Sequence, residues 1–278
     1  MAIVLAGLSA LMYGAADFCG GMAARRAPLP AVLVSSQAVG LAVALGGSLA
    51  FGFHSASVSD LAWGALAGVC GTAGIAALYT ALATTVVAVA SPLAAITGAA
   101  IPVLLGVASG ERPGIPAWAG ILLGAAAVVL LTVGPDPPGK NGNVRRAALL
   151  GILAGLGFGL FFFAISRTSH ASGLWPLVAA RVATVGLVVA FAGLTGRSLR
   201  FSAAGAPMIV LSGVLDMGAN IAFLLASRAG MLSISAAVAA LYPGPTVVLA
   251  WIVLRERITG LRVLGLGLAL AGVALISA

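Results

Sequence analysis

Apolar stretches long enough to cross a lipid bilayer recur along the whole chain. A transmembrane helix needs about 20 predominantly apolar residues to span a hydrocarbon core ~30 Å thick. Ten such stretches fit the 278 residues, at 2–22, 30–53, 60–82, 85–108, 115–134, 147–166, 173–195, 204–227, 231–254 and 260–278. A helix satisfies its own backbone hydrogen bonds in lipid. The sequence therefore predicts an all-α integral membrane protein with ten transmembrane helices, the first of them an uncleaved span.

Composition excludes the soluble classes of protein. The chain is 62% hydrophobic and 7% charged, whereas a soluble domain is about 25% charged. The formal net charge of +8 does not indicate nucleic-acid binding, because the basic residues stand singly or in pairs between apolar stretches. Basic residues at helix ends meet lipid headgroups and fix the orientation of the helices. We therefore expect a multi-pass protein of a cell membrane, the bacterial plasma or inner membrane.

A Pro/Gly/Asn-rich segment near the middle divides the chain into similar halves. We expect one five-helix repeat over 1–134, a polar linker over 135–146 and a second five-helix repeat over 147–278. A shift of 145 residues brings Gly68 onto Gly213, Glu111-Arg112 onto Glu256-Arg257 and Gly120 onto Gly265. This self-similarity predicts an internal repeat.

The distribution of basic residues predicts how the halves are oriented. Because each half has five helices, the second half enters the membrane in the opposite direction, as in the inverted repeats of many transporters. Connections after odd-numbered helices hold ten Lys or Arg residues, and those after even-numbered helices hold three. Since cytoplasmic loops are enriched in Lys and Arg, the odd connections are expected in the cytoplasm and both termini outside.

Four short motifs stand out in the predicted helices and at their ends. Helix 1 reads Leu11-Met12-Tyr13-Gly14-Ala15-Ala16-Asp17-Phe18, the seventh stretch carries Pro176 and Arg181, and the fourth and ninth end in Gly110-Glu111-Arg112 and Arg255-Glu256-Arg257. These motifs resemble the drug/metabolite transporter superfamily, EamA type. The first half lacks the Arg that this family has in the second helix of a repeat, and has Ser35, Ser36 and Gln37 near that position. The resemblance implies ten helices in two repeats and a transporter that exports amino acids, other metabolites or drugs.

Two acidic residues lie well inside predicted spans, where a carboxyl group is costly and marks a functional candidate. Tyr13 and Asp17 are four residues apart and share one helix face. Ser212, Asp216 and Asn220 form a polar stripe at the same spacing, which must avoid lipid. Asp216 could take up a proton or bind an amine, and Asn220 could contact a polar group. The alternative for both sites is a structural hydrogen bond between helices.

Other polar side chains have more than one interpretation. Arg181 is expected to reach a headgroup layer, with a substrate-carboxylate anchor and a structural ion pair as alternatives. Two acid–base pairs at helix ends, Glu111 with Arg112 and Glu256 with Arg257, are expected to be structural.

Three aromatic residues are candidates for a pocket, although aromatic residues also line membrane interfaces. These are Tyr79, Phe158 and Tyr242. Tyr242 precedes Pro243-Gly244-Pro245, and the fourth stretch has Pro92 and Pro102. Corresponding interruptions in two halves favour a binding site between them, with a packing kink as the alternative. Glycines at four-residue spacing, in Gly64-Gly68, Gly120-Gly124 and Gly151-Gly155-Gly159, are expected to let helix backbones approach closely.

We therefore predict a secondary active transporter that exports a small molecule and uses protons, with alternating access between the halves. The sequence carries no phosphate loop, zinc spacing or catalytic triad, so we expect no enzyme activity, no cofactor, no metal and no nucleic-acid partner. Membrane lipids and a small-molecule substrate are the expected partners, and the oligomeric state stays open. A membrane-embedded enzyme acting on lipids and a non-transporting scaffold are the alternatives.

Overall fold

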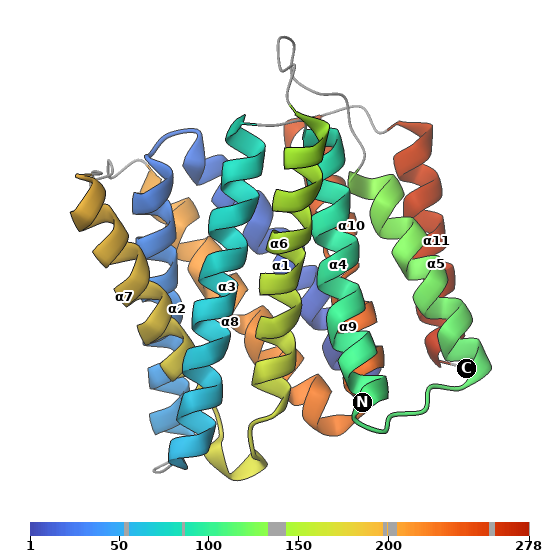
Figure 1. The fold of residues 1–278 in the computed structure, drawn as a ribbon, viewed down its shortest axis with the longest axis horizontal. Coiled ribbons are helices and arrows are strands. Elements are labelled where there is room, and N and C mark those ends of the chain that lie inside the picture. The colour runs from blue at the N-terminus through green and yellow to red at the C-terminus, as the bar shows by residue number, and fades with distance from the viewer. Residues whose placement is uncertain are drawn as a thin grey trace.

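The chain folds into a bundle of helices (Figure 1). The computed structural model describes residues 1–52, 56–84, 87–132, 143–196, 199, 205–255 and 259–277, without the side chains of residues 79, 82, 83, 87 and 88. Every regular element in these ranges is helical: α1 (Ala2–Ala24), α2 (Leu29–Ala50), α3 (Val58–Thr84), α4 (Val87–Ala108), α5 (Ile115–Thr132), α6 (Val144–Ser166), η1 (His170–Ser172), α7 (Trp175–Thr195), α8 (Ala206–Ala229), α9 (Leu232–Ala239), α10 (Pro243–Leu254) and α11 (Gly260–Ser277).

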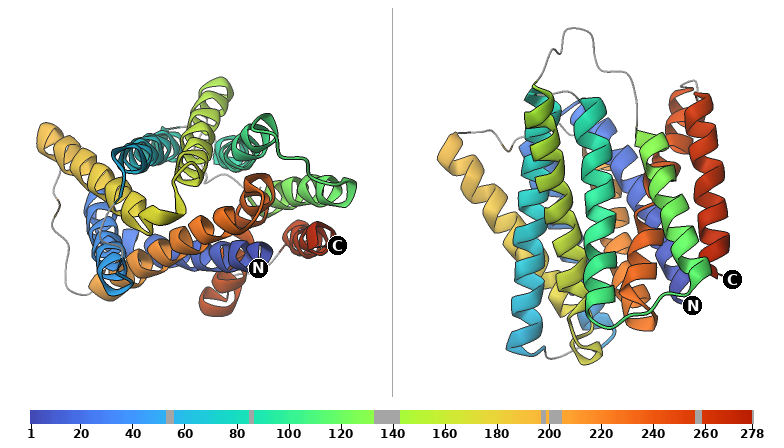
Figure 2. Two further views of the ribbon diagram at one scale, coloured as in Figure 1. Left: turned by 90° about the horizontal axis from the view of Figure 1, so that it is seen from below. Right: turned by 45° about the vertical axis from the view of Figure 1, so that its right-hand side comes forward.

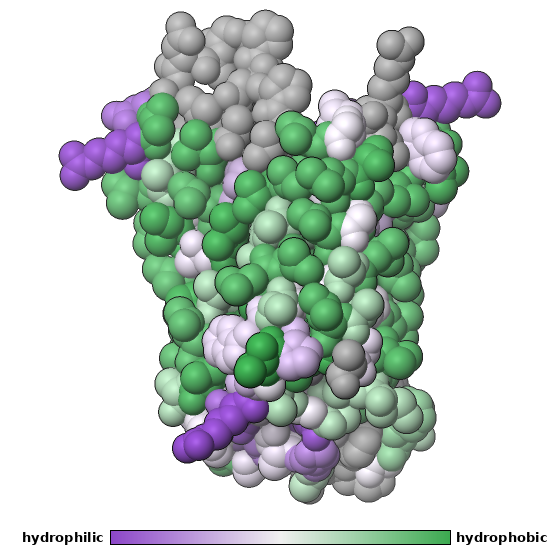
Figure 3. All heavy atoms as spheres, turned by 90° about the vertical axis from the view of Figure 1, so that its right-hand side faces the viewer, coloured by the Kyte–Doolittle hydropathy of each residue, from purple (hydrophilic) through white to green (hydrophobic). Residues whose placement is uncertain are grey.

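The surface of the bundle is that of a membrane protein. Ten segments are long and apolar enough to cross a membrane, with α9 and α10 together forming one of them. Hydrophobic side chains cover the middle of the surface in Figure 3, and hydrophilic ones gather towards its two ends. Large apolar side chains such as Leu270, 75% exposed, point outward, which is favourable only in lipid. The predicted all-α membrane fold is confirmed.

The two ends of the bundle differ in the chain segments that they carry. Both chain termini lie at one end, which we call the termini face (Figures 1 and 2). The C-terminal ends of α2, α4, α6 and α8 also lie there. The opposite end holds the C-terminal ends of α1, α3, α5, α7 and α10, together with Arg25 and Arg26 after α1 and Arg145 and Arg146 in the first turn of α6. We call this end the basic face.

The ninth span, predicted as one helix, consists of two helices in the structure. Helix α9 ends at Ala239 and α10 begins at Pro243, so residues 240–242 interrupt the span near its middle. Proline has no N–H to continue the hydrogen bonds of a preceding helix, but it is well accommodated in a first turn. By contrast α4 is continuous in spite of Pro92 and Pro102.

The end of the linker also differs from the expectation. Residues 133–142 lie outside the described part of the chain. Asn143 caps α6, because its side-chain Oδ1 accepts a hydrogen bond of 3.2 Å from the backbone N–H of Arg146. A side-chain acceptor at this position satisfies one of the free N–H groups of the first turn. Residues 144–146, assigned to the linker from the sequence, therefore form the first turn of α6.

Helices from the two halves of the sequence interlock rather than forming separate bundles. Helix α1 packs on α8 and α3 on α6, α2 packs on α7, and α5 packs on α11 at one edge of the bundle (Figure 2). The expected close approach at glycines is confirmed for α6. A Cβ atom at Gly151 or Gly155 would lie 2.6 Å from a carbonyl oxygen of α4, that of Ala90 or Ala94 respectively. These contacts bring the backbones of the two halves together.

Candidate functional site

A cavity of about 470 Å³ lies in the centre of the bundle. Ligand pockets typically measure about 300–1,000 Å³, so this cavity has room for a small molecule. It extends from the middle of the bundle to the C-terminal end of α1 and the start of α2, and so towards the basic face. Its walls come from α1, α2, α3, α4, α6 and α8 together with the α9–α10 break, and they include Tyr13, Asp17, Ser36, Gln37, Phe158, Phe161, Phe162, Ser212, Asp216, Asn220 and Tyr242.

A second cavity, of about 230 Å³, adjoins the first between α4, α5 and α10. Its walls include Ser91, Thr132 and Thr246. Residues that line both cavities are Asp17, Leu78, Ala94, Ala95, Phe158 and Tyr242. Asp17 therefore stands where the two spaces meet.

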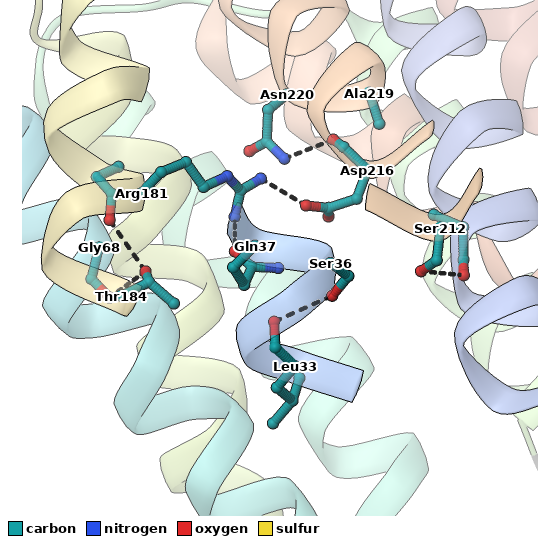
Figure 4. A network of polar contacts seen from close by, with 12 residues as sticks. Leu33, Ser36, Gln37, Gly68, Arg181, Thr184, Ser212, Asp216, Ala219 and Asn220 are labelled. Carbon is teal, nitrogen blue, oxygen red and sulfur yellow. Dashed lines mark hydrogen bonds and ion pairs between the residues drawn. The ribbon is translucent and has the colours of Figure 1, made fainter. Parts of the chain in front are cut away.

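A buried ion pair crosses the wall of the central cavity (Figure 4). Arg181 Nη2 of α7 donates to Asp216 Oδ2 of α8 at 2.5 Å. Arg181 Nη1 donates to the side-chain oxygen of Gln37 in α2. The side chain of Arg181 is 7% exposed and that of Asp216 24% exposed. Gly40 of α2 makes room for this arrangement, because a Cβ atom there would lie 3.3 Å from Arg181 Nε.

The expectation that Arg181 reaches a headgroup layer is therefore wrong. Its guanidinium points into the bundle, where a carboxylate and an amide compensate the cost of burying a charge. Spacing along one helix could not reveal this partner, because Asp216 lies 35 residues further along the chain on a different helix. The structural ion pair, one of the alternatives from the sequence, is what the structure contains.

The polar stripe of α8 faces the bundle interior. Ser212 Oγ donates to the carbonyl oxygen of Ala16 in α1 at 3.0 Å. Asn220 Nδ2 donates to the carbonyl oxygen of Asp216 at 2.7 Å. Among the described residues, neither Asn220 Oδ1 nor Arg181 Nε has a hydrogen-bond partner. The cavity wall thus combines groups that hold helices together with polar atoms that remain free.

Asp17 is the carboxylate of the cavity that is not compensated. Within the described part of the chain it has neither an ion pair nor a hydrogen bond to its side chain. Its side chain is exposed, and that exposed surface borders the two cavities. An unpaired carboxylate surrounded by apolar walls is costly, so its presence at a cavity indicates a functional role.

Aromatic rings line the cavity beside Asp17. The ring of Tyr13 meets that of Phe162 at 6.0 Å and that of Tyr242 at 6.3 Å, both edge to face. Phe161 and Phe162 meet at 5.5 Å. Such edge-to-face pairs are the favoured geometry of aromatic rings. Two of these rings, Phe161 and Phe162, belong to the run 158–163, from which the sequence predicts only Phe158 as a pocket residue.

Polar contacts gather at the termini face around the turn between α6 and α7. Asp60, at the start of α3, accepts hydrogen bonds from the backbone N–H and the hydroxyl of Ser169, at 2.8 and 2.7 Å. Arg228, at the end of α8, donates to the carbonyl oxygens of Ser169 and Gly173 at 2.6 and 3.0 Å, and to the hydroxyl groups of Thr168 and Ser172 at 3.2 Å. We call these contacts the closure network.

Glu111 adds a further contact between the halves at the same face. Its carboxylate accepts hydrogen bonds from the backbone N–H groups of Leu232 at 2.5 Å and of Ser233 at 2.8 Å. These are N–H groups of the first turn of α9, where the positive end of the helix dipole favours an anion. In the described residues Glu111 makes no ion pair with Arg112. Glu111 thus has a structural contact as expected, but with a helix terminus instead of its neighbour.

The structure brings together most of the residues singled out from the sequence. Tyr13, Asp17, Phe158, Asp216, Asn220 and Tyr242 all line the central cavity. The side chain of Tyr79 and the residues Glu256 and Arg257 lie outside what the structure describes. Sequence reasoning did not identify the contacts made by the side chains of Gln37, Asp60 and Arg228. In the part of the chain that is described, no group of three or more His, Cys, Asp or Glu residues could hold a metal ion.

Comparison with known proteins agrees with this architecture. Residues 145–278 match the model of the EamA-like transporter family. No curated protein sequence matches the chain. A solved crystal structure superposes on it with a TM-score of 0.78, over 98% of this chain and 95% of that one, at 19% sequence identity. At that identity the likeness establishes the fold alone. The match confirms the resemblance drawn from the sequence for residues 145–278, which are similar to the EamA-like transporter family of the drug/metabolite transporter superfamily.

Proposed function

We propose that the protein is a secondary active transporter that moves a small molecule through the central cavity by alternating access. The observation that carries the proposal is the cavity itself, which is lined by helices of both halves and whose described lining reaches towards the basic face. A binding space between two halves is the expected arrangement of an alternating-access transporter. The match of residues 145–278 to a transporter family supports the same function.

The closure network and the Glu111 contact together support a conformation that is closed at the termini face. Asp60 and Glu111 belong to the first half of the sequence, and their partners Ser169 and Ser233 belong to the second. Contacts between the halves at this face must break if the cavity is to open there. Beneath the cavity, on the same side, pack the buried side chains of Ile165, Leu177, Phe223 and Leu224. We propose that opening of this face and closing of the basic face complete the transport cycle.

The pattern of helix contacts supports an inverted repeat. Under the 145-residue shift, the contact of α1 with α8 corresponds to that of α6 with α3. The contact of α4 with α6 corresponds to that of α1 with the α9–α10 span, and both pairs of contacts are present. Contacts that occur in matched pairs are what a two-fold axis between repeats would give. We propose that the halves are related by such an axis in the membrane plane.

For the driving force we propose a proton gradient, with export as the direction of substrate movement. The sequence favours Asp216 for proton coupling, but in the structure Arg181 compensates the charge of Asp216. Asp17 borders the cavity without such a partner, so we assign the coupling proton to Asp17 instead. A carboxyl group that gains and loses a proton as water enters and leaves the cavity could link the two movements.

Transport in liposomes tests the function. Purified protein is reconstituted with a pH-sensitive dye inside the vesicles, and amino acids, amines, drugs and sugars are added one at a time. A substrate should cause a change of internal pH that empty vesicles do not give. Asp17→Asn should abolish this change even at substrate concentrations high enough for uptake down a substrate gradient to be measured. A substrate whose movement never changes the internal pH would exclude proton coupling, and a lack of movement for every class would contradict transport.

A further inference from the structure

We propose that the central cavity takes a monovalent organic cation, in which an ammonium group is carried on an apolar or aromatic body, and that Asp17 supplies its counter-charge. The proposal rests on the transport function proposed above, since it names the class of substrate for the same cavity. It follows from the charge balance of the cavity and from the side chains that surround Asp17.

The charge balance of the cavity favours a cation. Asp17 and Asp216 both line the cavity, and the guanidinium of Arg181 is bound to Asp216 and Gln37. Arg181 itself is not among the described residues that line the space. The ion pair is therefore neutral as a unit, and the carboxylate of Asp17 leaves one negative charge facing the ligand. In a site of low dielectric this charge attracts a cation strongly and repels an anion.

The same balance disfavours carboxylates and zwitterions. A bound carboxylate needs a cationic or multiply donating partner, and a guanidinium is the side chain best suited to it. The described cavity-lining residues include no Lys, Arg or His. An amino acid could place its ammonium group at Asp17, but its carboxylate would find no free cation among these residues.

Aromatic rings on the walls favour an organic cation over a bare inorganic one. Tyr13 lies one helical turn before Asp17 on α1, and its ring contacts those of Phe162 and Tyr242 edge to face. The faces of aromatic rings attract ammonium groups within about 6 Å of the ring centroid. A metal ion would need several oxygen ligands, and the described residues hold no group of three or more acidic, His or Cys side chains.

Three probes of nearly the same shape test the proposal on the full-length protein in detergent micelles. They are 2-phenylethylamine, 3-phenylpropionate and phenylalanine, which carry at neutral pH a positive charge, a negative charge and both. Equilibrium binding to the wild-type protein is measured for each by calorimetry. The amine should bind at least about tenfold tighter than either of the others, a difference of roughly 1.4 kcal/mol. Equal or weaker binding of the amine, or none, overturns the proposal without any variant.

Substitutions then locate the counter-charge. Asp17→Asn should weaken amine binding by about tenfold or more, because it removes the charge at constant size, while Asp17→Glu should retain it. Arg26→Gln, at an exposed site on the basic face, changes the charge outside the cavity and should leave amine binding unchanged. Amine binding that survives Asp17→Asn contradicts the assignment. Transport of phenylalanine or a sugar together with absence of amine binding would overturn the substrate class and leave the transport function standing.

Discussion

Arg181 Nη2 lies 2.5 Å from Asp216 Oδ2, and this ion pair joins α7 to α8 beside the central cavity. The sequence predicts that Asp216 exchanges protons, but in the structure Arg181 compensates its charge. The sequence also predicts that Arg181 reaches the headgroups, but its guanidinium lies in the bundle interior. The pair also reaches the first half of the chain through Gln37 on α2. Its charges are therefore part of how the two halves are held together around the cavity.

Breaking this pair on one side should destabilise the protein strongly. Asp216→Asn leaves the buried guanidinium of Arg181 without its carboxylate, and loss of one partner of a buried pair costs about 3–5 kcal/mol. The protein should then unfold at a lower temperature in detergent, measured by its intrinsic tryptophan fluorescence. This differs from the expectation for a free carboxylate, for which Asn would preserve shape and stability.

The double variant Arg181→Met with Asp216→Leu tests whether the stability lost in Asp216→Asn comes from the unpaired charge of Arg181. Because it removes both charges together, it should be more stable than Asp216→Asn alone, although it leaves Gln37 without the donor. Arg181→Met and Asp216→Leu are also measured singly. If the stability lost in the double variant equals the sum of the losses in these two variants, the two side chains are not coupled.

Glu111 should stabilise α9 from outside that helix. Glu111→Gln removes the charge that accepts from the N–H groups of Leu232 and Ser233, and a charged cap of a helix start contributes roughly 1–2 kcal/mol. Thermal unfolding in detergent should therefore occur at lower temperature. Arg112→Gln is the matched control, because Arg112 is exposed next to Glu111. Equal loss in both variants would point to a general charge effect at this turn.

Gly14 should tolerate no side chain, because α1 crosses the α9–α10 break there. A Cβ atom would lie 2.5 Å from the carbonyl oxygen of Tyr242 and 2.7 Å from Cβ of Pro245. Overpacking of this kind costs about 1–3 kcal/mol, so Gly14→Ala should lower the unfolding temperature and displace a wall of the cavity. Gly7→Ala on the same helix meets no atom within 4 Å and should have no such effect. Equal unfolding temperatures of the two variants would contradict this packing.

The ten spans could be predicted from the sequence because a bilayer imposes one length and one chemistry on every helix. The break in the ninth span had a local signal as well, in Pro243-Gly244-Pro245. In the same way, spacing along α1 and α8 indicated that Tyr13 would share a face with Asp17 and Asp216 with Asn220. All four residues line the cavity.

Partners on different helices could not be predicted in this way. Glu111 meets Ser233 across 122 positions of the chain, and Asp60 meets Ser169 across 109. Helix periodicity carries no information on which helix lies opposite. Asp60 also stands in the first turn of a helix, where an acidic residue is common for local reasons. Its contact with the α6–α7 turn therefore had no distinctive signal.

The excess of basic residues predicts how the protein lies in the membrane. The basic face should be cytoplasmic, because the sequence holds ten Lys or Arg residues between the odd-numbered predicted spans and the spans that follow them, against three after the even-numbered spans. A reporter fused to the C-terminus should then be active on the outer side, and one inserted in the central linker on the cytoplasmic side. Activity of the C-terminal fusion only in the cytoplasm would reverse the orientation.

Arg228 should hold the termini face closed, because it fixes the turn between α6 and α7 to which Asp60 of the first half binds. It donates hydrogen bonds to four groups in the turn between α6 and α7, and bonds to a charged group contribute roughly 1.5–3 kcal/mol each. Arg228→Gln should therefore raise the population of the state that is open at this face. The measurement is the labelling rate of Ser172→Cys, a site 1% exposed, by an impermeant maleimide after Cys19 and Cys70 are replaced by Ala. Loss of even 1.4 kcal/mol corresponds to about tenfold faster labelling.

Arg167→Gln is the control, because Arg167 is exposed at the same face and contacts the ring of Phe163 instead of the turn. Equal labelling rates in the two variants would show that Arg228 does not control access from this side.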